Sequence, residues 1–296
     1  MSQIHPTAFV DPRAELGANV CVGAFAYVGP EVVIGDDCVI HPHATVLGPS
    51  VFGRGNQVFP QATLGAAPQD LKYKGGPTRL EIGDNNIFRE NVTVHRGTEV
   101  DRTSSGRTRI GNRNLFMCGV HVAHDSEVGD HVILANNVLV AGHVRIENCV
   151  TIGGASAMHH FTTIGRNAYV GGMTRITHDV PPYVKVQGYD QEVRGVNTEG
   201  MRRWRIDADS ISAVKQAFRL IFPRRGDRSL GRTAEAIREI EQNGLIDDEH
   251  VRYLVEFLRR KIEIGVYGRV REALRSDADR DREAFYSASS KTQAPS

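Results

Sequence analysis

An apolar residue recurs at every sixth position over long stretches of this chain. One series runs from Ile110 to Ile176 through twelve apolar positions, and another runs unbroken from Ile4 to Leu64. An α-helix cannot use this period, because 3.6 residues per turn would scatter such positions around its circumference. Short strands joined by tight turns can use it, with one apolar side chain of each strand pointing inward. The period therefore predicts a β-helix of hexapeptide repeats over residues 1–188.

Histidines crowd the series from Ile110 to Ile176. If three hexapeptides make one coil, residues eighteen positions apart stack at the usual strand spacing of about 4.8 Å. His124 would then lie one coil from Gly142 and two coils from His160. The histidines of this stretch are His121, His124, His143, His159 and His160. We expect the chemistry of the protein on the edge of the coil where they converge.

Two segments that lack the apolar positions interrupt the repeat, at residues 66–79 and 97–108. Long excursions from a rigid scaffold often carry function. After Pro181-Pro182 the period becomes helical, which predicts a small helical domain over residues 189–274 and a polar, disordered tail over residues 275–296. The helices are expected at residues 197–204, 208–222, 232–242 and 247–264.

The charge balance and the cysteines argue against several classes of protein. The formal net charge is +1, so nothing draws the chain as a whole to nucleic acid or to an anionic membrane. The four cysteines show no CxxC spacing, which argues against a zinc site or a disulfide framework. Neither a secretory signal nor an apolar run long enough for a membrane span is visible. We therefore expect a cytoplasmic protein.

His124 is the candidate general base, since an imidazole can take up a proton near neutral pH. Asp125 could orient it, although adjacent strand residues point to opposite faces, so the pairing requires a corner of the coil. The alternative is an ordinary hydrogen-bonded surface histidine. Gly142 would leave its backbone N–H open to an oxyanion one coil away. Tight corners also favour glycine for conformational reasons alone.

Two further clusters fit a phosphorylated, polyhydroxylated ligand. Gln69, Asp70 and Lys72 could bind hydroxyl and phosphate groups from the first interruption, or could belong to a solvated loop. Arg203, with Asn197 and Glu199 nearby, opens the helical domain and could hold a diphosphate or form a solvated face. No phosphate-binding glycine loop, metal site or cofactor site is predicted.

A set of motifs connects these residues to a known family. The chain contains, in order, QDLKY, PTRLEIGD, VTVHRGT, HVAHD, LANN, LAGHV, DVPPYV and GVNTEGMRR. With them it resembles the bacterial UDP-N-acetylglucosamine O-acyltransferases, which carry out the first step of lipid A biosynthesis, over roughly residues 3–264. The resemblance implies a left-handed parallel β-helix followed by a small helical domain. It also implies a homotrimer with active sites in clefts between neighbouring prisms.

The resemblance assigns roles to individual residues. His124, with Asp125 as partner, would deprotonate the 3-hydroxyl of UDP-N-acetylglucosamine for attack on a 3-hydroxyacyl-acyl carrier protein thioester. Gly142 would face the oxyanion, and Gly172 falls where the family's acyl-length ruler lies. Substrate-contacting roles are implied for Gln69, Asp70, Lys72, His121, His143 and His159, and nucleotide contacts from a neighbouring subunit for Asn197, Glu199 and Arg203.

The chain also departs from the family pattern. His160 stands where the family often has glutamine, and Trp204 where a second arginine is common. The segment 97–108 and the tail after about residue 265 are longer than expected. A related UDP-sugar N-acyltransferase carries an extra domain before its repeats, whereas here the repeats begin at Ile4. A metal-dependent β-helix enzyme of the carbonic anhydrase kind is a further alternative, and a non-catalytic scaffold would not need these motifs on one edge.

Overall fold

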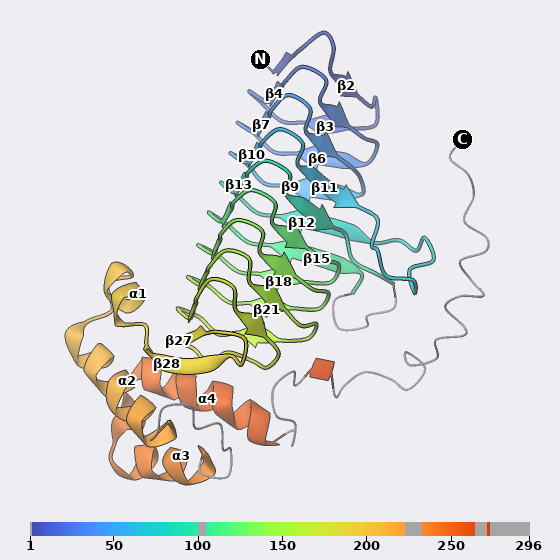
Figure 1. Ribbon diagram of the computed structural model, residues 1–296. Coiled ribbons are helices and arrows are strands. Elements are labelled where there is room, and N and C mark those ends of the chain that lie inside the picture. The colour runs from blue at the N-terminus through green and yellow to red at the C-terminus, as the bar shows by residue number, and fades with distance from the viewer. Residues whose placement is uncertain (1, 100–104, 223–232, 264–270, 273–296) are drawn as a thin grey trace.

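The chain folds into a tapering coil of parallel strands followed by a small group of helices (Figure 1). The computed structural model describes residues 2–99, 105–222, 233–263 and 271–272. Three sheets form the three faces of the coil, which we call sheets A, B and C, and each turn of the chain adds one strand to each of them. The hexapeptide period thus produces the β-helix that the sequence predicts.

Sheet A contains β1 (Gln3–Ile4), β4 (Cys21–Val22), β7 (Val39–Ile40), β10 (Gln57–Val58), β13 (Ile87–Phe88), β16 (Leu115–Phe116), β19 (Ile133–Leu134), β22 (Thr151–Ile152), β25 (Tyr169–Val170), β27 (Val184–Gln187) and β28 (Glu192–Val196). Sheet B contains β2 (Phe9–Val10), β5 (Tyr27–Val28), β8 (Thr45–Val46), β11 (Thr63–Ala66), β14 (Thr93–His95), β17 (His121–Val122), β20 (Leu139–Val140), β23 (Ala157–Met158) and β26 (Arg175–Ile176). Sheet C contains β3 (Glu15–Leu16), β6 (Val32–Ile34), β9 (Ser50–Phe52), β12 (Arg79–Ile82), β15 (Arg107–Ile110), β18 (Glu127–Val128), β21 (Arg145–Ile146) and β24 (Thr163–Ile164).

The register between coils confirms the spacing of eighteen residues. Val122 pairs with Val140, and Val140 pairs with Met158. These side chains point inward and are almost fully buried, as the period requires. In the first coil of the described residues the inward side chain is less covered, and Ile4 is 48% exposed.

Both interruptions leave the coil at the same edge, between a strand of sheet B and the next strand of sheet C. The first joins β11 to β12 and the second joins β14 to β15. Stacking continues past them, because Leu64 pairs with Val94, and Val94 pairs with Val122. We call this edge the B–C corner, and the two segments lengthen it without disturbing the core.

The helical domain follows an antiparallel pair of strands. β28 pairs with β27, so sheet A continues past the boundary that we expected at residue 188. The helices are α1 (Thr198–Arg203), α2 (Ala208–Ile221), α3 (Thr233–Gln242) and α4 (Glu249–Glu263), with a 3-10 turn, η2 (Leu245–Asp247), before α4. Their bounds lie within about two residues of the predicted ones, which is the usual disagreement at helix ends.

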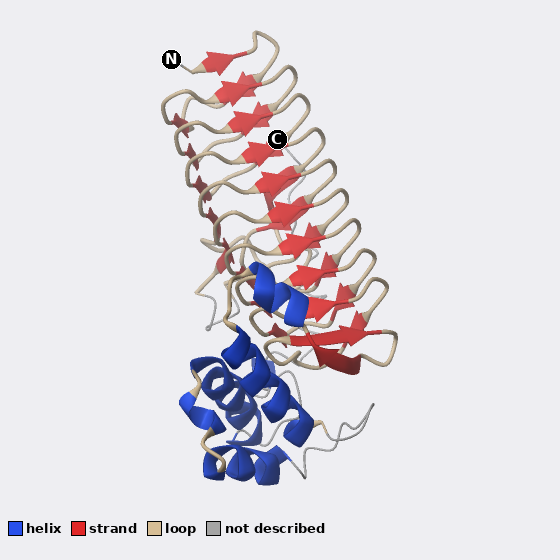
Figure 2. Cartoon of the chain, turned by 90° about the vertical axis from the view of Figure 1, so that its left-hand side faces the viewer, coloured by secondary structure: helices blue, strands red, loops and turns tan. Residues whose placement is uncertain are grey.

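Side-chain caps explain two of the helix starts. The Asn197 side chain accepts a hydrogen bond from Gly200 N, and the Asp207 side chain accepts one from Ser210 N. α1 lies over the last coils of sheet A (Figure 2), where the Trp204 ring contacts the His131 ring at 4.8 Å between centroids. No helix within the described ranges is long and apolar enough to cross a membrane. The expected tail, 275–296, lies outside the described residues.

Candidate active site

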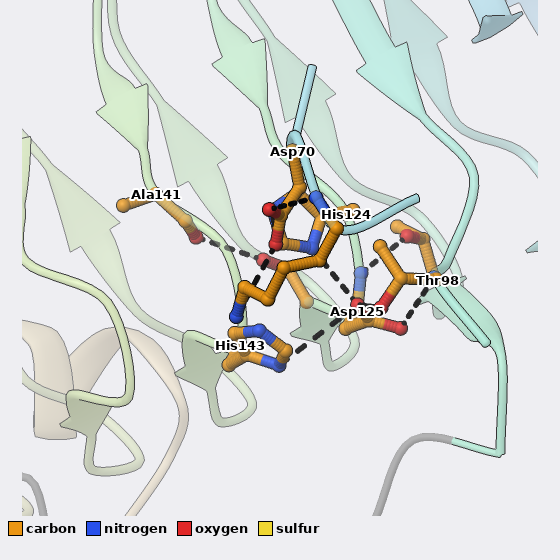
Figure 3. Close-up of polar contacts among 9 residues, drawn as sticks. Asp70, Thr98, His124, Asp125, Ala141 and His143 are labelled. Carbon is orange, nitrogen blue, oxygen red and sulfur yellow. Dashed lines mark hydrogen bonds and ion pairs between the residues drawn. The ribbon is translucent and has the colours of Figure 1, made fainter. Parts of the chain in front are cut away.

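The B–C corner gathers the two long loops and most of the histidine cluster (Figure 3). His124 follows β17, His143 follows β20, and His159 follows β23, so each occupies the same corner in successive coils. The backbone N–H of His143 donates to the carbonyl oxygen of His124, which fixes the two turns against each other. The predicted convergence of these histidines is therefore present.

His124 and Asp125 form a close pair at this corner. Asp125 has a φ of 58°, and this left-handed turn lets two consecutive side chains face each other. His124 Nδ1 lies 2.8 Å from Asp125 Oδ2. Because a carboxylate accepts hydrogen bonds, we assign the imidazole proton to Nδ1, which leaves Nε2 as the nitrogen that can take up a proton. The sequence predicted this pairing on the condition of a corner, and the condition is met.

Asp125 is held from several directions. Its carboxylate is buried and accepts hydrogen bonds from Thr98 N at 2.9 Å and from Thr98 Oγ1 at 2.7 Å. Its backbone N–H donates to Thr108 Oγ1 at 2.8 Å. The second loop thus supplies the residues that orient the carboxylate, and the carboxylate orients His124. Thr98 ends the motif VTVHRGT, but no role was predicted for it, because a threonine inside an irregular loop carries no periodic signal.

The first loop brings charged groups to the open side of His124. Asp70 Oδ2 lies 3.7 Å from His124 Nε2 and 3.6 Å from Lys72 Nζ. Arg96 anchors this loop, since its guanidinium donates to Gly65 O at 3.0 Å and to Tyr73 Oη at 3.1 Å. Lys72 and Asp70 therefore reach the site as expected, while Gln69 is exposed on the same loop.

Gly142 provides the space that the His124 ring occupies. A Cβ atom at Gly142 would lie 2.6 Å from His124 Cε1 and 2.8 Å from Nε2. The backbone does not require glycine here, because the equivalent corner position carries His124 one coil earlier and His160 one coil later. Room for the imidazole is a role that the sequence did not reveal, and the oxyanion contact of Gly142 stays a prediction.

The remaining histidines surround this pair. The His143 ring meets the His124 ring edge-on at 5.1 Å and stacks on Phe161 at 4.4 Å. His159 packs against His160, with ring centroids 3.8 Å apart. His121 projects from β17, and its Nδ1 lies 2.8 Å from Thr93 Oγ1. Burial and the nearby His124 lower the pKa of His121.

His95 is a buried histidine of this site that sequence analysis did not single out. Its ring lies 4.9 Å from that of His121, and its Nδ1 has no hydrogen-bond partner among the described residues. Burial, followed by the charges of His121, His124 and Arg96, lowers the pKa of His95 to about 4. The signal in the sequence that could have identified it is its position. His95 directly follows the apolar residue Val94, whereas glycine follows Leu64 at the equivalent place one coil earlier.

The lowered pKa of His95 predicts a pH dependence of stability. The folded protein keeps this imidazole neutral below its ordinary value of 6.5, whereas the unfolded chain takes up a proton there. Stability from this group is therefore lost as the pH falls from 6.5 toward 4, by about 2 kcal/mol between pH 7 and pH 5. In His95→Gln, the free energy of unfolding measured with denaturant should fall by that much less between pH 7 and pH 5. His5→Gln, at an exposed histidine, should keep the wild-type difference. The same difference between the two pH values in all three proteins would contradict the assignment.

The donor atoms of His124, Asp125 and His143 lie within 4.8 Å of one another. An acidic side chain, that of Asp125, therefore accompanies two histidines here, although the sequence predicts no metal site. Its carboxylate nevertheless already accepts hydrogen bonds from Thr98 and His124, which accounts for its burial without an ion. The absence of a metal stays a prediction.

Four of the predicted site residues lie away from this corner in a single chain. Asn197, Glu199 and Arg203 line a pocket on sheet A together with Trp204 and Lys185. The Asn197 side chain is also used within the chain, since it caps α1 and donates to Asn167 O at 2.9 Å. Gly172 follows β25 and occupies the corner between sheets A and B. One chain alone does not bring these residues to His124.

The face of sheet C carries a larger groove, but its charged side chains are paired with each other. Glu81 binds Arg79 at 2.6 Å, and Glu127 binds Arg145 at 2.7 Å. No histidine lines this groove within the described ranges. The B–C corner is therefore the candidate active site.

The comparison with known proteins first identifies the class of protein to which the chain belongs. Residues 2–48 and 107–142 match the bacterial transferase hexapeptide repeat, described as six repeats. Together with the coil and its histidine corner, this match defines a hexapeptide-repeat transferase with a left-handed parallel β-helix. The predicted fold class is confirmed.

The family follows from the second domain and from whole-chain relatives. Residues 179–266 match domain 2 of UDP N-acetylglucosamine O-acyltransferase. The acyl-[acyl-carrier-protein]–UDP-N-acetylglucosamine O-acyltransferase of Saccharophagus degradans is 51% identical over 224 residues, covering 76% of this chain and 86% of that protein. The enzyme of the same name from Syntrophobacter fumaroxidans is 48% identical over 221 residues, covering 74% and 84%. The chain belongs to the UDP-N-acetylglucosamine O-acyltransferase family.

Solved structures agree with this assignment. LpxA from Acinetobacter baumannii superposes with a TM-score of 0.81 at 40% identity, covering 88% of this chain and 97% of that chain. LpxA from Bacteroides fragilis, a UDP-N-acetylglucosamine acyltransferase, gives a TM-score of 0.80 at 38% identity, covering 86% and 96%. The fold and the family were both predicted from the motifs.

Proposed function

We propose that this acyltransferase moves a 3-hydroxyacyl chain from acyl carrier protein to the 3-hydroxyl of UDP-N-acetylglucosamine, the first step of lipid A biosynthesis. The two substrates are those in the names of the relatives. The observation that carries the proposal is the His124–Asp125 pair, with Nε2 of His124 on the open side of the corner. No cofactor is needed for this transfer, and we place the reaction in the cytoplasm.

His124 acts as the general base in this mechanism. Its Nε2 takes the proton of the sugar 3-hydroxyl while the oxygen attacks the thioester carbonyl carbon. The carbonyl becomes a tetrahedral oxyanion, to which the Gly142 backbone N–H can donate. Collapse of the oxyanion breaks the carbon–sulfur bond, and the proton on His124 passes to the leaving thiolate. The ester and the free thiol of the carrier protein are the products, and the base is restored.

The surrounding residues bind and orient the substrates. The Asp125 carboxylate stabilises the imidazolium that forms during the reaction, as in other histidine–carboxylate pairs. Asp70, which lies 3.7 Å from His124 and 3.6 Å from Lys72, offers an acceptor for sugar hydroxyls, and Lys72 offers a cation for phosphate. Gln69, His121, His143 and His159 complete the proposed substrate contacts.

A homotrimer would bring Asn197, Glu199 and Arg203 of one chain to the corner of the next. Light scattering should then give the mass of three chains. Inactive His124→Ala and Arg203→Ala chains, expressed together, should recover activity, because mixed assemblies contain some clefts with both residues intact. A fully active monomer, or no recovery in mixed assemblies that have formed, would contradict this arrangement.

Gly172 is proposed to leave the end of the acyl groove open. A Cβ atom there would already make a tight contact with Gly154 O at 3.3 Å, and a longer side chain would narrow the proposed groove further. Wild-type enzyme should prefer long 3-hydroxyacyl chains, and Gly172→Met should shift the preference to shorter ones. Rates with a series of acyl-carrier-protein thioesters measure this, and an unchanged profile would remove Gly172 from the ruler.

The same assay separates the alternative functions. A 3-amino analogue of UDP-N-acetylglucosamine tests for the N-acyltransferase reaction, which would form an amide. Metal analysis of the purified protein, with turnover before and after chelation, tests the metal-dependent reading of the His124, Asp125 and His143 cluster. Ester formation that survives chelation is the expected result.

A further inference from the structure

A short segment beyond the family's second domain contacts the active-site corner. The domain match ends at residue 266, and Arg271 and Glu272 lie past it. The Arg271 guanidinium donates to the carbonyl oxygen of His143. Glu272 Oε1 lies 3.2 Å from His160 Nε2. These two residues therefore contact the coil at His143 and His160.

The first contact reaches a neighbour of the catalytic pair, and the second reaches a histidine two coils further along the same corner. The His143 ring lies edge-on to His124 at 5.1 Å, so a donor on the His143 carbonyl holds the turn that positions this ring. The His160 ring packs on that of His159 at 3.8 Å, so a carboxylate on His160 fixes the surface against which His159 rests. One contact acts on the backbone of the corner and the other on a side chain.

The contacts also join two departures of this chain from its family. His160 stands where glutamine is frequent, and the tail after about residue 265 is longer than expected. Glu272, which belongs to the longer tail, pairs with His160. A protonated imidazole can form an ion pair with a carboxylate, whereas a glutamine side chain cannot. A histidine at position 160 is therefore suited to the longer C-terminal segment.

We propose that Arg271 and Glu272 are positioning residues of the active site, which order His143 and His160 for substrate binding. The inference rests on the proposed function of this corner. It makes these two residues part of the acyl-transfer site. Neither residue touches the reacting atoms in this account, so their loss should raise KM more than it lowers kcat.

Steady-state kinetics on full-length variants test this role. Arg271→Ala should raise KM about tenfold, since a charged donor to a carbonyl is lost. Arg271→Lys, which keeps a cationic donor, should recover most of this loss. Glu272→Gln should raise KM about two- to fivefold, because the side chains of His160 and Glu272 are 38% and 32% exposed and solvent screens the pair.

The sharpest test is whether the effects of changing Glu272 and His160 depend on each other. If Glu272 acts through His160, then Glu272→Gln should have no further effect in a His160→Gln background. Arg252→Ala removes a guanidinium bond to the Asp247 carbonyl, far from the corner, and should leave KM unchanged. Additive effects of Glu272→Gln and His160→Gln, or wild-type KM in Arg271→Ala, would overturn the proposal.

A second readout does not depend on turnover. Hydrogen–deuterium exchange should rise in Arg271→Ala in peptides that contain residues 142–146, and should stay at the wild-type level in Arg252→Ala. If wild-type enzyme transfers no acyl group, the proposed function fails while this exchange still decides whether the contact exists. Equal exchange in wild type and Arg271→Ala would refute the contact itself.

Discussion

Replacing His124 by alanine should lower kcat about 10²–10⁴-fold, the usual cost of removing a positioned general base. The side chain faces the open side of the corner and the hydrophobic core lies elsewhere, so oligomeric mass and melting temperature should stay close to those of wild type. Steady-state rates, with light scattering and thermal melts, measure these effects.

Matched histidine variants make this result specific. His143→Ala and His159→Ala should lose less turnover, since both are assigned to binding. His43→Ala removes an exposed histidine at another corner of the coil and should retain full activity. Near-wild-type turnover in His124→Ala, together with loss of turnover when one of the other corner histidines is replaced, would show that the general base is that histidine and not His124.

Gly142→Ala should be the second most damaging change. The new Cβ would lie 2.6 Å from His124 Cε1, so the ring must move away from its bond with Asp125 or the turn must shift. Misplacement of a reacting group by about 1 Å can cost about 10²-fold in rate, and we expect a loss of that order in kcat. Turnover measured beside that of His124→Ala gives the comparison.

A glycine with a movable neighbour provides the control. A Cβ at Gly29 would meet Tyr27 Cε1 at 3.2 Å, and the partly exposed tyrosine ring can turn aside. Gly29→Ala should therefore keep wild-type turnover. If Gly142→Ala were equally active, the space beside the His124 ring would not be needed for catalysis.

The period of six was enough to predict which residues share an edge of the coil. Strand pairing every eighteen residues places His124, Gly142 and His160 at one corner, and this follows from spacing alone. The pairing of His124 with Asp125 was predictable in outline, because consecutive side chains can meet at a turn. The regular geometry of the coil therefore made the centre of the candidate site predictable.

The supporting residues could not be predicted in the same way. Thr98 holds Asp125 from a loop that leaves the repeat, and nothing in its spacing specifies where its side chain lies. His95 follows an apolar position, but its burial depends on the coils and loops around it. Arg271 meets His143 across 128 residues of sequence, outside any repeat. Contacts of this kind depend on tertiary packing.

The most direct test of the proposed reaction is identification of its product. Purified protein is incubated with UDP-N-acetylglucosamine and a long 3-hydroxyacyl-acyl carrier protein, without added metal or cofactor, and the nucleotide product is examined by mass spectrometry and NMR. We predict one acyl group in ester linkage at the 3-hydroxyl, formed in step with release of the carrier-protein thiol and greatly slowed in His124→Ala. Recovery of unmodified UDP-N-acetylglucosamine and intact thioester from well-folded enzyme would contradict the account.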